Sequence, residues 1–339
     1  MLSNILEYSL SEFENEIVAL GEKKFRAKQI YSWIIKGVDD FGEMKNLPKV
    51  LVETLNENFV IDLPRQVEVQ ISETDGTRKY LFELTDQNRI EAVFMKYKYG
   101  NTVCVSSQAG CKMGCKFCAS TLNGLSRNLT PGEILGQIIA AEKESQEKIN
   151  HVVVMGIGEP FDNYENVSKF LKLLNDKDGL NIGMRNITIS TCGIIPVIDR
   201  FGDDFPQVNL AVSLHAATDV NRTEIMPINN KYPIKELLSA CRRYVNKTHR
   251  RITFEYTLVD GKNDSREDAA ALAKLLKGLL CHVNLIPLNP VAETGLRKAR
   301  RENINAFLRE LEKRGIQATV RRELGDEIDA ACGQLRLRK

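Results

Sequence analysis

The sequence predicts an α/β protein whose main part is an incomplete barrel of six parallel strands, each followed by a helix. Between residues 102 and 288, short runs rich in β-branched residues alternate with segments of helical periodicity. A strand, a crossover helix and the next strand pair in parallel through a right-handed connection. Six such units fall short of the eight that close a full barrel.

The predicted barrel strands and helices follow one another without a long interruption. The strands are TVCVSS (102–107), HVVVM (151–155), NITIST (186–191), VNLAVSLH (208–215), RITFEYTLV (251–259) and HVNLIPL (282–288). Helical segments at 131–146, 164–175, 196–201, 234–246 and 266–278 separate them, and a helix at 301–314, a strand IQATVRR and a loop LGDEIDAACGQL follow. In such barrels the chemistry lies where strands end, so residues at those positions are the first candidates.

The first 97 residues have a different pattern. Helical periodicity near 10–20, 26–36 and 48–58 is followed by the strand-like runs QVEVQI, RKYLFEL and IEAVFMKY. We therefore predict an N-terminal α+β accessory domain over residues 1–97 and a barrel domain over residues 98–339.

Composition restricts the class of protein. With 339 residues, 43% of them hydrophobic, the chain can bury a large core. No apolar run approaches the roughly 20 residues of a membrane span, and we expect a cytoplasmic protein without membrane contact. The net charge is only +2, so a polyanionic partner must bind local basic patches.

Three of the eight cysteines, Cys111, Cys115 and Cys118, crowd into CKMGCKFC after the first predicted barrel strand. A C-x3-C-x2-C loop brings three thiolates together and leaves a fourth coordination position open. This spacing predicts an iron–sulfur cluster with one open iron. The alternative is a zinc site completed by a distant residue, in a zinc-stabilised RNA-binding module without catalysis. The four histidines are scattered singly and no second CxxC pair is present, which favours iron.

A glycine-rich turn, MGIGEP, follows the second predicted barrel strand. Gly156 and Gly158 permit close backbone approach, and the Glu159 carboxylate can accept an ammonium group. By itself such a turn is typical of ordinary loop geometry. The cysteine triad one strand earlier favours a ligand site.

Polar side chains also mark the ends of later strands. Ser190 ends the third strand, Ser213 and His215 end the fourth, and Asn289 follows the last. Each taken singly fits an ordinary strand-end cap. Their shared place at the barrel rim favours a common ligand.

CKMGCKFC resembles the cluster loop of the radical S-adenosylmethionine (radical SAM) superfamily. The likeness continues through VSSQAG, MGIGEP, STCGIIP, VSLHA, MPIN, NLIPLNP and DEIDAACGQL, and over nearly the whole chain it resembles the RlmN family of RNA methyltransferases. The Cfr-type antibiotic-resistance methylases form a sister group that shares the cluster loop and the catalytic cysteine pair. The tail and the GEP turn favour RlmN.

The resemblance implies a partial barrel of the radical SAM type that carries a [4Fe-4S] cluster on the triad and binds S-adenosylmethionine. Its implied cofactor-binding residues are Gly158, Glu159, Ser190, Ser213, Leu214, His215 and Asn289. The implied reaction is methylation of C2 of adenine 2503 in 23S rRNA and of adenine 37 in tRNAs, with two S-adenosylmethionine molecules consumed. Cfr-type methylation at C8 of the same rRNA adenine is the alternative.

The resemblance also implies three catalytic roles. Cys332 would carry the methyl group as S-methylcysteine, Cys104 would release the product by forming a disulfide with Cys332, and Glu91 would accept a proton. Without the resemblance, Cys104 reads as a buried strand cysteine and Glu91 as a solvated edge charge. A radical enzyme acting on a protein or metabolite would need no carrier such as Cys332. We assign the three other cysteines to packing.

Implied partners are 23S rRNA, tRNA and an electron donor such as flavodoxin. Basic residues cluster at 23–28, 242–251 and 297–301, enough for local phosphate contacts. Tyr31 and Trp33 follow the first cluster within one predicted helix, and we expect them to offer stacking surfaces for bases. The accessory domain is thus expected to bind RNA.

Overall fold

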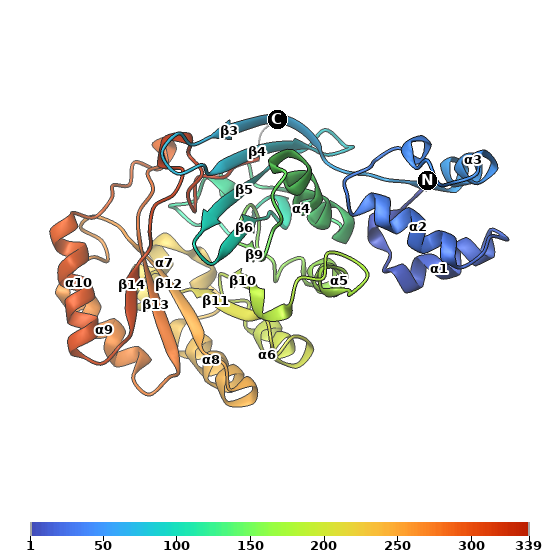
Figure 1. The fold of residues 1–339 in the computed structure, drawn as a ribbon. Helices are drawn as coiled ribbons and strands as arrows, with labels where there is room; N and C mark the ends of the chain where they lie inside the picture. The colour runs from blue at the N-terminus through green and yellow to red at the C-terminus, as the bar shows by residue number, and fades with distance from the viewer. Residues whose placement is uncertain (1, 338–339) are drawn as a thin grey trace.

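The computed structural model describes residues 2–337 and has a ten-stranded mixed sheet at its centre (Figure 1). Its order is β14-β13-β12-β11-β10-β9-β6-β5-β4-β3, and neighbours from β6 to β14 pair in parallel. The parallel strands are β6 (Gly100–Cys104), β9 (His151–Val154), β10 (Ile187–Thr191), β11 (Asn209–Ser213), β12 (Ile252–Leu258), β13 (Cys281–Pro287) and β14 (Ala318–Val320). The predicted partial barrel is confirmed, with β14 as an added parallel strand.

A helix follows each of the six predicted barrel strands. The helices are α4 (Pro131–Ser145), α5 (Tyr164–Asn175), α6 (Ile195–Asp204), α7 (Asp219–Ile225), α8 (Ile234–Thr248), α9 (Arg266–Leu276) and α10 (Arg301–Lys313). Local sequence sets the start of α4, where Thr130 caps the helix in a capping box with Glu133 and Pro131 occupies the first turn. Within residues 2–337, no helix is both long and apolar enough to cross a bilayer.

The N-terminal segment contributes both separate helices and part of the main sheet. Helices α1 (Leu10–Ala19), α2 (Phe25–Ile34) and α3 (Lys49–Asn58) stand at one end of the molecule in Figure 1, with β1 (Ser3–Asn4) paired to β2 (Phe59–Val60). Strands β3 (Arg65–Ile71), β4 (Arg78–Glu83) and β5 (Arg89–Tyr97) continue the barrel sheet in antiparallel order. The sheet therefore runs across residue 97, and the division at that residue stays a prediction.

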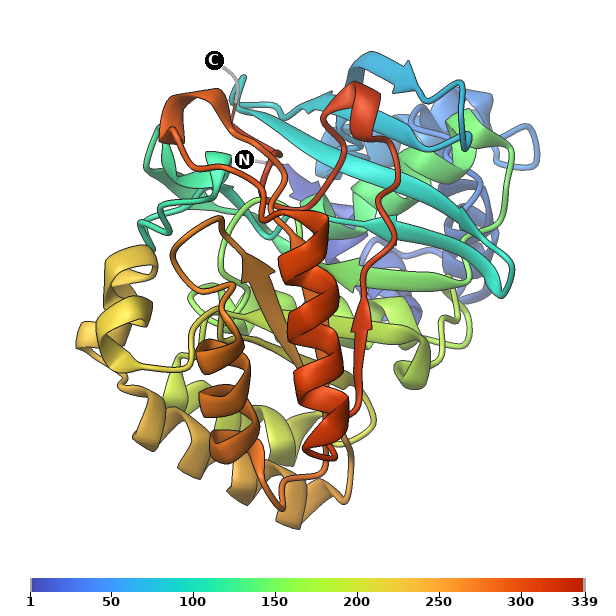
Figure 2. The same cartoon turned by 90° about the vertical axis from the view of Figure 1, so that its left-hand side faces the viewer.

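Two features of the site region were not predicted. A small hairpin of β7 (Gln108–Gly110) and β8 (Leu125–Asn128) encloses the cysteine loop, and the short helix α7 precedes α8. After β14 the chain runs to a 3-10 turn (Asp326–Ile328) beside the β3–β4 hairpin (Figure 2). There Glu327 accepts a hydrogen bond from Ser72 Oγ at 2.6 Å. This tail, residues 325–337, carries Cys332.

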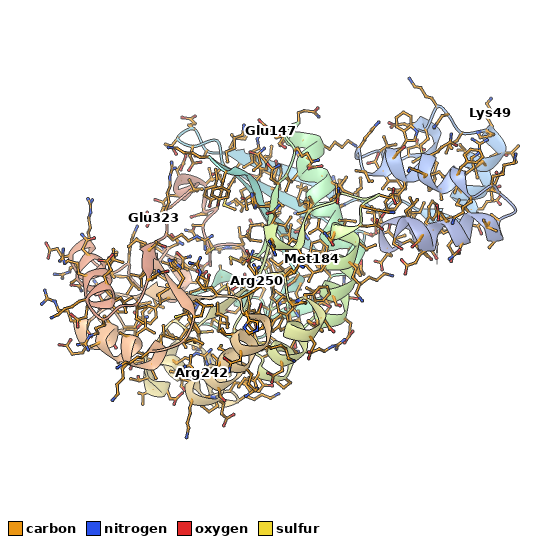
Figure 3. All side chains as sticks on the ribbon, turned by 60° about the horizontal axis from the view of Figure 1, so that its bottom comes forward. Lys49, Glu147, Met184, Arg242, Arg250 and Glu323 are labelled. Carbon is orange, nitrogen blue, oxygen red and sulfur yellow. The ribbon has the colours of Figure 1, made fainter. Side chains whose placement is uncertain are left out.

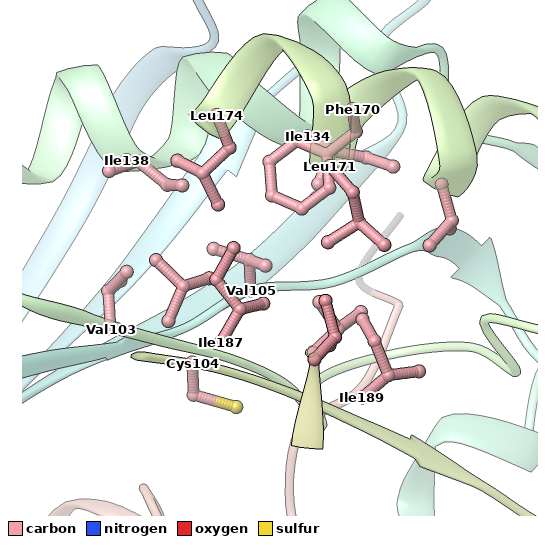
Figure 4. Close-up of a cluster of buried hydrophobic side chains, with 14 of the residues drawn as sticks. Val103, Cys104, Val105, Ile134, Ile138, Phe170, Leu171, Leu174, Ile187 and Ile189 are labelled. Atoms are coloured by element: carbon pink, nitrogen blue, oxygen red, sulfur yellow. The ribbon is translucent and has the colours of Figure 1, made fainter. Parts of the chain in front are cut away.

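The core shows which side of β6 faces the barrel interior. Figure 4 shows Val103 and Val105 turned toward α4 and α5, which carry Ile138 and Phe170, and all four side chains are buried. Successive side chains of a strand point to opposite faces. The sulfur of Cys104 points away from these helices and so toward the inside of the barrel.

Candidate active site

One cavity at the carboxyl ends of the parallel strands gathers most of the residues predicted for the site. Its walls include the cysteine triad, residues on the loops after β9 and β13, the ends of β10 and β11, and the C-terminal tail. The predicted residues that line it are Cys111, Cys115, Cys118, Gly158, Glu159, Ser190, Ser213, His215, Asn289 and Cys332. Residues predicted from different strand ends thus share one cavity, while their roles in catalysis and cofactor binding stay a prediction.

Two sets of hydrogen bonds shape the cysteine loop: one to the unpredicted β7–β8 hairpin and one within the loop itself. The Cys111 N–H donates to the Gly124 carbonyl at 2.9 Å, which closes the base of the loop at the hairpin. Farther along, the Cys118 N–H donates to the Cys115 carbonyl at 3.2 Å. The Thr121 hydroxyl donates to the carbonyls of Cys115 and Cys118 at 3.3 and 3.0 Å. These bonds hold the loop in a conformation that turns all three thiols to one cavity.

The donor chemistry of the triad suits a metal cluster with a cationic inorganic core, whose total charge becomes negative once the three thiolates bind it. Burial raises the pKa of Cys111 to about 12, and burial and the neighbouring thiols raise the pKa values of Cys115 and Cys118. A bound metal group displaces the protons of these thiols. Its positive charge stabilises the buried thiolates, which burial alone disfavours. Thiolates around a single zinc ion lie within roughly 4 Å of one another. Among residues 2–337, no group of three His, Cys, Asp or Glu side chains is gathered closely enough to hold a single metal ion. In a four-iron cluster each thiolate binds its own iron.

The glycines after β9 allow their turn to lie very close to the segment of the chain that follows β6. A Cβ added at Gly158, whose φ is +108°, would lie 2.6 Å from the Gln108 Cβ. One added at Gly156 would lie 2.7 Å from the Val105 carbonyl oxygen. The turn can thus pack directly on the chain after β6, and Gln108 Oε1 accepts the Glu159 N–H at 2.8 Å.

Glu159 links two strand ends at the cavity wall. The residue is 4% exposed, and its carboxylate accepts hydrogen bonds from the Thr191 hydroxyl at 2.7 Å, the Cys192 N–H at 2.7 Å and the Phe161 N–H at 3.0 Å. Burial raises the pKa of Glu159, while these hydrogen bonds oppose the rise. The loop after β9 is therefore tied to the end of β10, with the carboxyl group still in the cavity wall.

His215 lies after β11 in a left-handed backbone conformation, with φ of +55°. Its Nδ1 accepts the Thr257 N–H at 2.9 Å, so in the neutral ring the proton is assigned to Nε2. Burial, together with the nearby Arg222 charge, lowers the pKa of His215 to about 3. The Phe117 ring meets the imidazole edge to face at 4.8 Å. His215 is thus a neutral hydrogen-bond donor at the cavity wall.

Leu214 differs from the other predicted cofactor residues because it does not line the cavity. Its side chain is fully buried in the main core. Its N–H donates to the Glu255 carbonyl and its own carbonyl accepts from Arg222 Nε, both at 3.1 Å. Leu214 thereby sets the path of the chain between Ser213 and His215.

Cys332 lies between the main cavity and an adjoining one. It lines both, and Cys104 lines the second. Asn289 Nδ2 donates to the Cys332 carbonyl at 3.0 Å, and the carbonyl of Gly333 accepts the Ala119 N–H at 2.7 Å, one residue beyond Cys118. Burial raises the pKa of Cys104 to about 12, with Cys332 adding to the rise. Both cysteines are free thiols.

Sequence reasoning missed Arg321, which lines both cavities just beyond β14. The backbone N–H of Arg321 donates to the Leu285 carbonyl at 2.8 Å, and its guanidinium Nη1 lies 4.0 Å from Glu255 Oε2. The nearby Cys332 thiol is the main cause of a raised pKa at Arg321. The strand-end rule applied to IQATVRR would have singled out this arginine.

Glu91 lies outside both of these cavities. It is 2% exposed on β5 and lines a small separate cavity with Lys79 and Glu68. One carboxylate oxygen accepts the Arg336 N–H at 2.8 Å. The structure therefore joins Glu91 to the tail four residues after Cys332, a contact between positions 245 residues apart in the sequence.

The aromatic expectation for the first basic cluster was wrong for Tyr31. Tyr31 is only 5% exposed and its hydroxyl donates to the Tyr8 carbonyl, so no base can stack on it. Trp33 donates through Nε1 to Asn46 at 2.7 Å and is partly buried. Phe25, 51% exposed with the Arg26 guanidinium 5.0 Å from its ring centre, presents an aromatic face instead.

Helix α6 supplies acidic partners to two of the five Lys and Arg side chains in the basic cluster at 242–251. Arg243 pairs with Asp199 at 2.7 Å and Lys247 with Asp203 at 2.6 Å. Figure 3 shows Arg242 of this cluster on the barrel, far from Lys49 at the tip of the N-terminal helices. This cluster therefore lies on a different part of the molecule from the tip of the N-terminal helices.

The barrel and its three-cysteine cavity define a class, because a model of the Radical SAM superfamily matches residues 105–273. A model of the Ribosomal RNA large subunit methyltransferase N-terminal domain matches residues 3–61, the separate helices. A radical SAM methyltransferase from Sphaerobacter thermophilus superposes with a TM-score of 0.94 at 45% identity, covering 98% of this chain and 99% of that one.

Full-length relatives narrow the class. A "Probable dual-specificity RNA methyltransferase RlmN" of Clostridium botulinum (strain Eklund 17B / Type B) is 56% identical over 335 residues, 99% of this chain and 96% of that protein. The protein of the same name from Clostridium perfringens (strain SM101 / Type A) is 55% identical, over 99% and 97%. The chain belongs to the RlmN family of the radical SAM superfamily.

Proposed function

We propose that this chain is an RNA methyltransferase that methylates C2 of adenine 2503 in 23S rRNA and of adenine 37 in tRNAs. One observation carries the proposal: Cys332 lies between a cavity lined by the cysteine triad and a cavity lined by Cys104. A carrier that first receives a methyl group and then passes it on needs access to a donor on one side and to a resolving thiol on the other.

Cys111, Cys115 and Cys118 would hold a [4Fe-4S] cluster, and Glu159, His215 and their neighbours on the cavity wall would bind S-adenosylmethionine. When bound, these groups supply a methyl group for Cys332 and a carbon radical that can abstract hydrogen. Adenine C2 lies between two ring nitrogens and is electron-poor, so it cannot attack a sulfonium methyl group directly. A radical route through a carrier removes that obstacle.

The chain's own residues would then act in sequence. The Cys332 thiolate accepts the methyl group, with the Arg321 guanidinium as its counter-charge. After a hydrogen atom is removed from the S-methyl group, that carbon adds to adenine C2. The Cys104 thiolate attacks the Cys332 sulfur, so that an S–S bond forms as the bond between the Cys332 sulfur and the transferred carbon breaks. That carbon keeps the bonding pair and takes up a proton to become the methyl group, and the unpaired electron left by the addition would be taken up by the redox group that the triad holds. Two S-adenosylmethionine molecules are consumed per methylated base.

Glu91 would accept the C2 proton. The hydrogen bond that Glu91 accepts from the Arg336 N–H would make that role depend on the tail. Because one segment holds both Cys332 and Arg336, a shift of the tail toward substrate would release this carboxylate oxygen. The proton acceptor and the methyl carrier would thus become available together.

Residues 1–97 would provide an RNA-binding domain, and a flavodoxin-type protein would supply electrons. Phe25 with Arg26 offers an exposed aromatic and cationic surface on α2. An adenine inside folded RNA must leave its stack to reach a barrel cavity, so contacts outside the barrel would anchor the RNA during entry. An enzyme that acts on 23S rRNA and tRNA would work in the cytoplasm.

Three cysteine variants test the carrier mechanism with 23S rRNA, cofactor and reductant. Cys332→Ala is expected to form no methylated base. Cys104→Ala is expected to accumulate a covalent protein–RNA adduct, because the thioether forms and cannot be resolved. Cys281→Ala, a buried cysteine at the start of β13, is the control and should retain activity. Methylation by Cys332→Ala would refute the mechanism.

Mass spectrometry of nucleosides from the modified rRNA tests the position of the methyl group. We expect 2-methyladenosine. A product consisting of 8-methyladenosine would instead support the Cfr-type alternative, which uses the same cysteines.

A further inference from the structure

Arg222, on α7, is fully buried directly behind the cavity wall. Every hydrogen bond of its guanidinium goes to a neutral oxygen. The acceptors are the carbonyls of Leu214 at 3.1 Å, Cys192 at 2.8 Å, Ser213 at 3.2 Å and Tyr232 at 3.2 Å, and Asn229 Oδ1 at 2.9 Å. The group is fully hydrogen-bonded, yet none of these partners carries a negative charge.

The nearest acid on the same helix does not neutralise this charge. Asp219 is engaged by Asn229 Nδ2 at 3.0 Å and by the Ile234 N–H at 2.9 Å. Over residues 2–337, no carboxylate oxygen lies within the 4.0 Å of an ion pair with Arg222. A buried guanidinium without a counter-ion costs several kcal/mol. Such a charge indicates that a negative group belongs nearby.

Arg222 lies next to the residues on which the cysteine loop packs. Cys192, whose carbonyl accepts the 2.8 Å bond, is buried in a small apolar cluster with Ile225 and Met226. Cys115 packs against that cluster, and the Lys116 N–H donates to the Ile225 carbonyl at 2.9 Å. The charge reaches the loop electrostatically: burial raises the pKa of Cys115, and Arg222 opposes the rise.

We propose that Arg222 is a positioning residue whose buried charge balances the negative charge of the iron–sulfur cluster and raises its reduction potential. This inference rests on the proposed function, in which the triad holds that cluster. Accepting one electron from a low-potential flavodoxin-type donor makes the site one unit more negative. In surroundings of low dielectric, a fixed positive charge behind the loop favours that reduced state.

The test compares Arg222→Gln and Arg222→Lys in the full-length protein after anaerobic reconstitution with iron and sulfide. The midpoint potential is measured by a redox titration followed by electron paramagnetic resonance. Arg222→Gln is expected to lower the ratio of reduced to oxidised cluster at least about tenfold at a fixed potential, which is a shift of about 59 mV. Arg222→Lys keeps the charge and should shift less than half as far.

Asn229→Asp provides a second variant that leaves the arginine in place. It replaces a neutral acceptor 2.9 Å from Arg222 Nη1 by a carboxylate, and it should also move the potential in the negative direction. Arg250→Gln is the control. The Arg250 guanidinium donates to Asn209, at the end of β11 opposite to the cavity (Figure 3).

Two outcomes separate the inference from the proposed function. Wild-type iron content with an unchanged midpoint potential in Arg222→Gln, or in Asn229→Asp if the first variant does not fold, overturns the role of Arg222. Wild-type protein that takes up zinc without labile sulfide would instead overturn the proposed cluster itself.

Discussion

His215→Asn provides a direct test of how the cavity wall controls protonation. The backbone at His215 has φ of +55°, a conformation that asparagine adopts more readily than most residues. An asparagine Oδ1 also occupies nearly the place of Nδ1, so the 2.9 Å bond from the Thr257 N–H can be kept. The substitution therefore removes the titrating ring while retaining its local structural role.

The expected effect follows from the pKa of His215, which burial and the Arg222 charge lower to about 3 from an ordinary value of 6.5. As the pH falls below 6.5, the unfolded chain takes up a proton that the folded chain excludes, so stability decreases. The loss approaches about 1.4 kcal/mol per pH unit and amounts to roughly 2.3 kcal/mol between pH 6.5 and 4.5, because the unfolded chain's imidazole is already half protonated at pH 6.5. His215→Asn should lack this component of the pH dependence.

The assay is urea denaturation of the metal-free protein followed by circular dichroism at several pH values from 7.5 to 4.5. His249→Asn is the matched control, because His249 has φ of +53° but lies exposed at the end of α8. The quantity compared is the slope of the free energy of unfolding against pH in the two variants and the wild type. If His215→Asn keeps the wild-type slope, the imidazole is not held neutral by burial.

Two further substitutions test the walls of the two cavities. Gly158→Ala should cost about 2 to 5 kcal/mol, from a strained left-handed residue and a Cβ only 2.6 Å from Gln108, whereas Gly261→Ala, with φ of +70° and open space, should cost about 1 to 2 kcal/mol. Equal melting temperatures would refute the packing argument. Arg321→Gln should slow alkylation of Cys332 by iodoacetamide several-fold, measured by peptide mass spectrometry, because the thiolate loses its counter-charge. The adjacent, exposed Arg322→Gln is the control, and equal alkylation rates in both variants would contradict the role of Arg321.

Local patterns in the sequence determined the order of the barrel elements and the cysteine loop. Runs of β-branched residues and helical periodicity can be recognised from residues close together in the sequence. The structure confirmed the parallel barrel that these patterns predicted. The shared location of the strand-end residues was also predictable from the sequence, because parallel strands have their carboxyl ends at the same edge of the sheet. Ser190, Ser213, His215 and Asn289 accordingly line one cavity.

Only the tertiary structure decided which polar groups are buried and what they bind. Arg222 and Arg321 read as ordinary charges in the sequence, and Tyr31 as a surface aromatic, because burial depends on elements far away in the chain. The contact of Glu91 with Arg336 and the place of Cys332 beside Cys104 join positions more than 200 residues apart. No local pattern encodes such pairings, since they arise when the tail packs back onto the completed barrel.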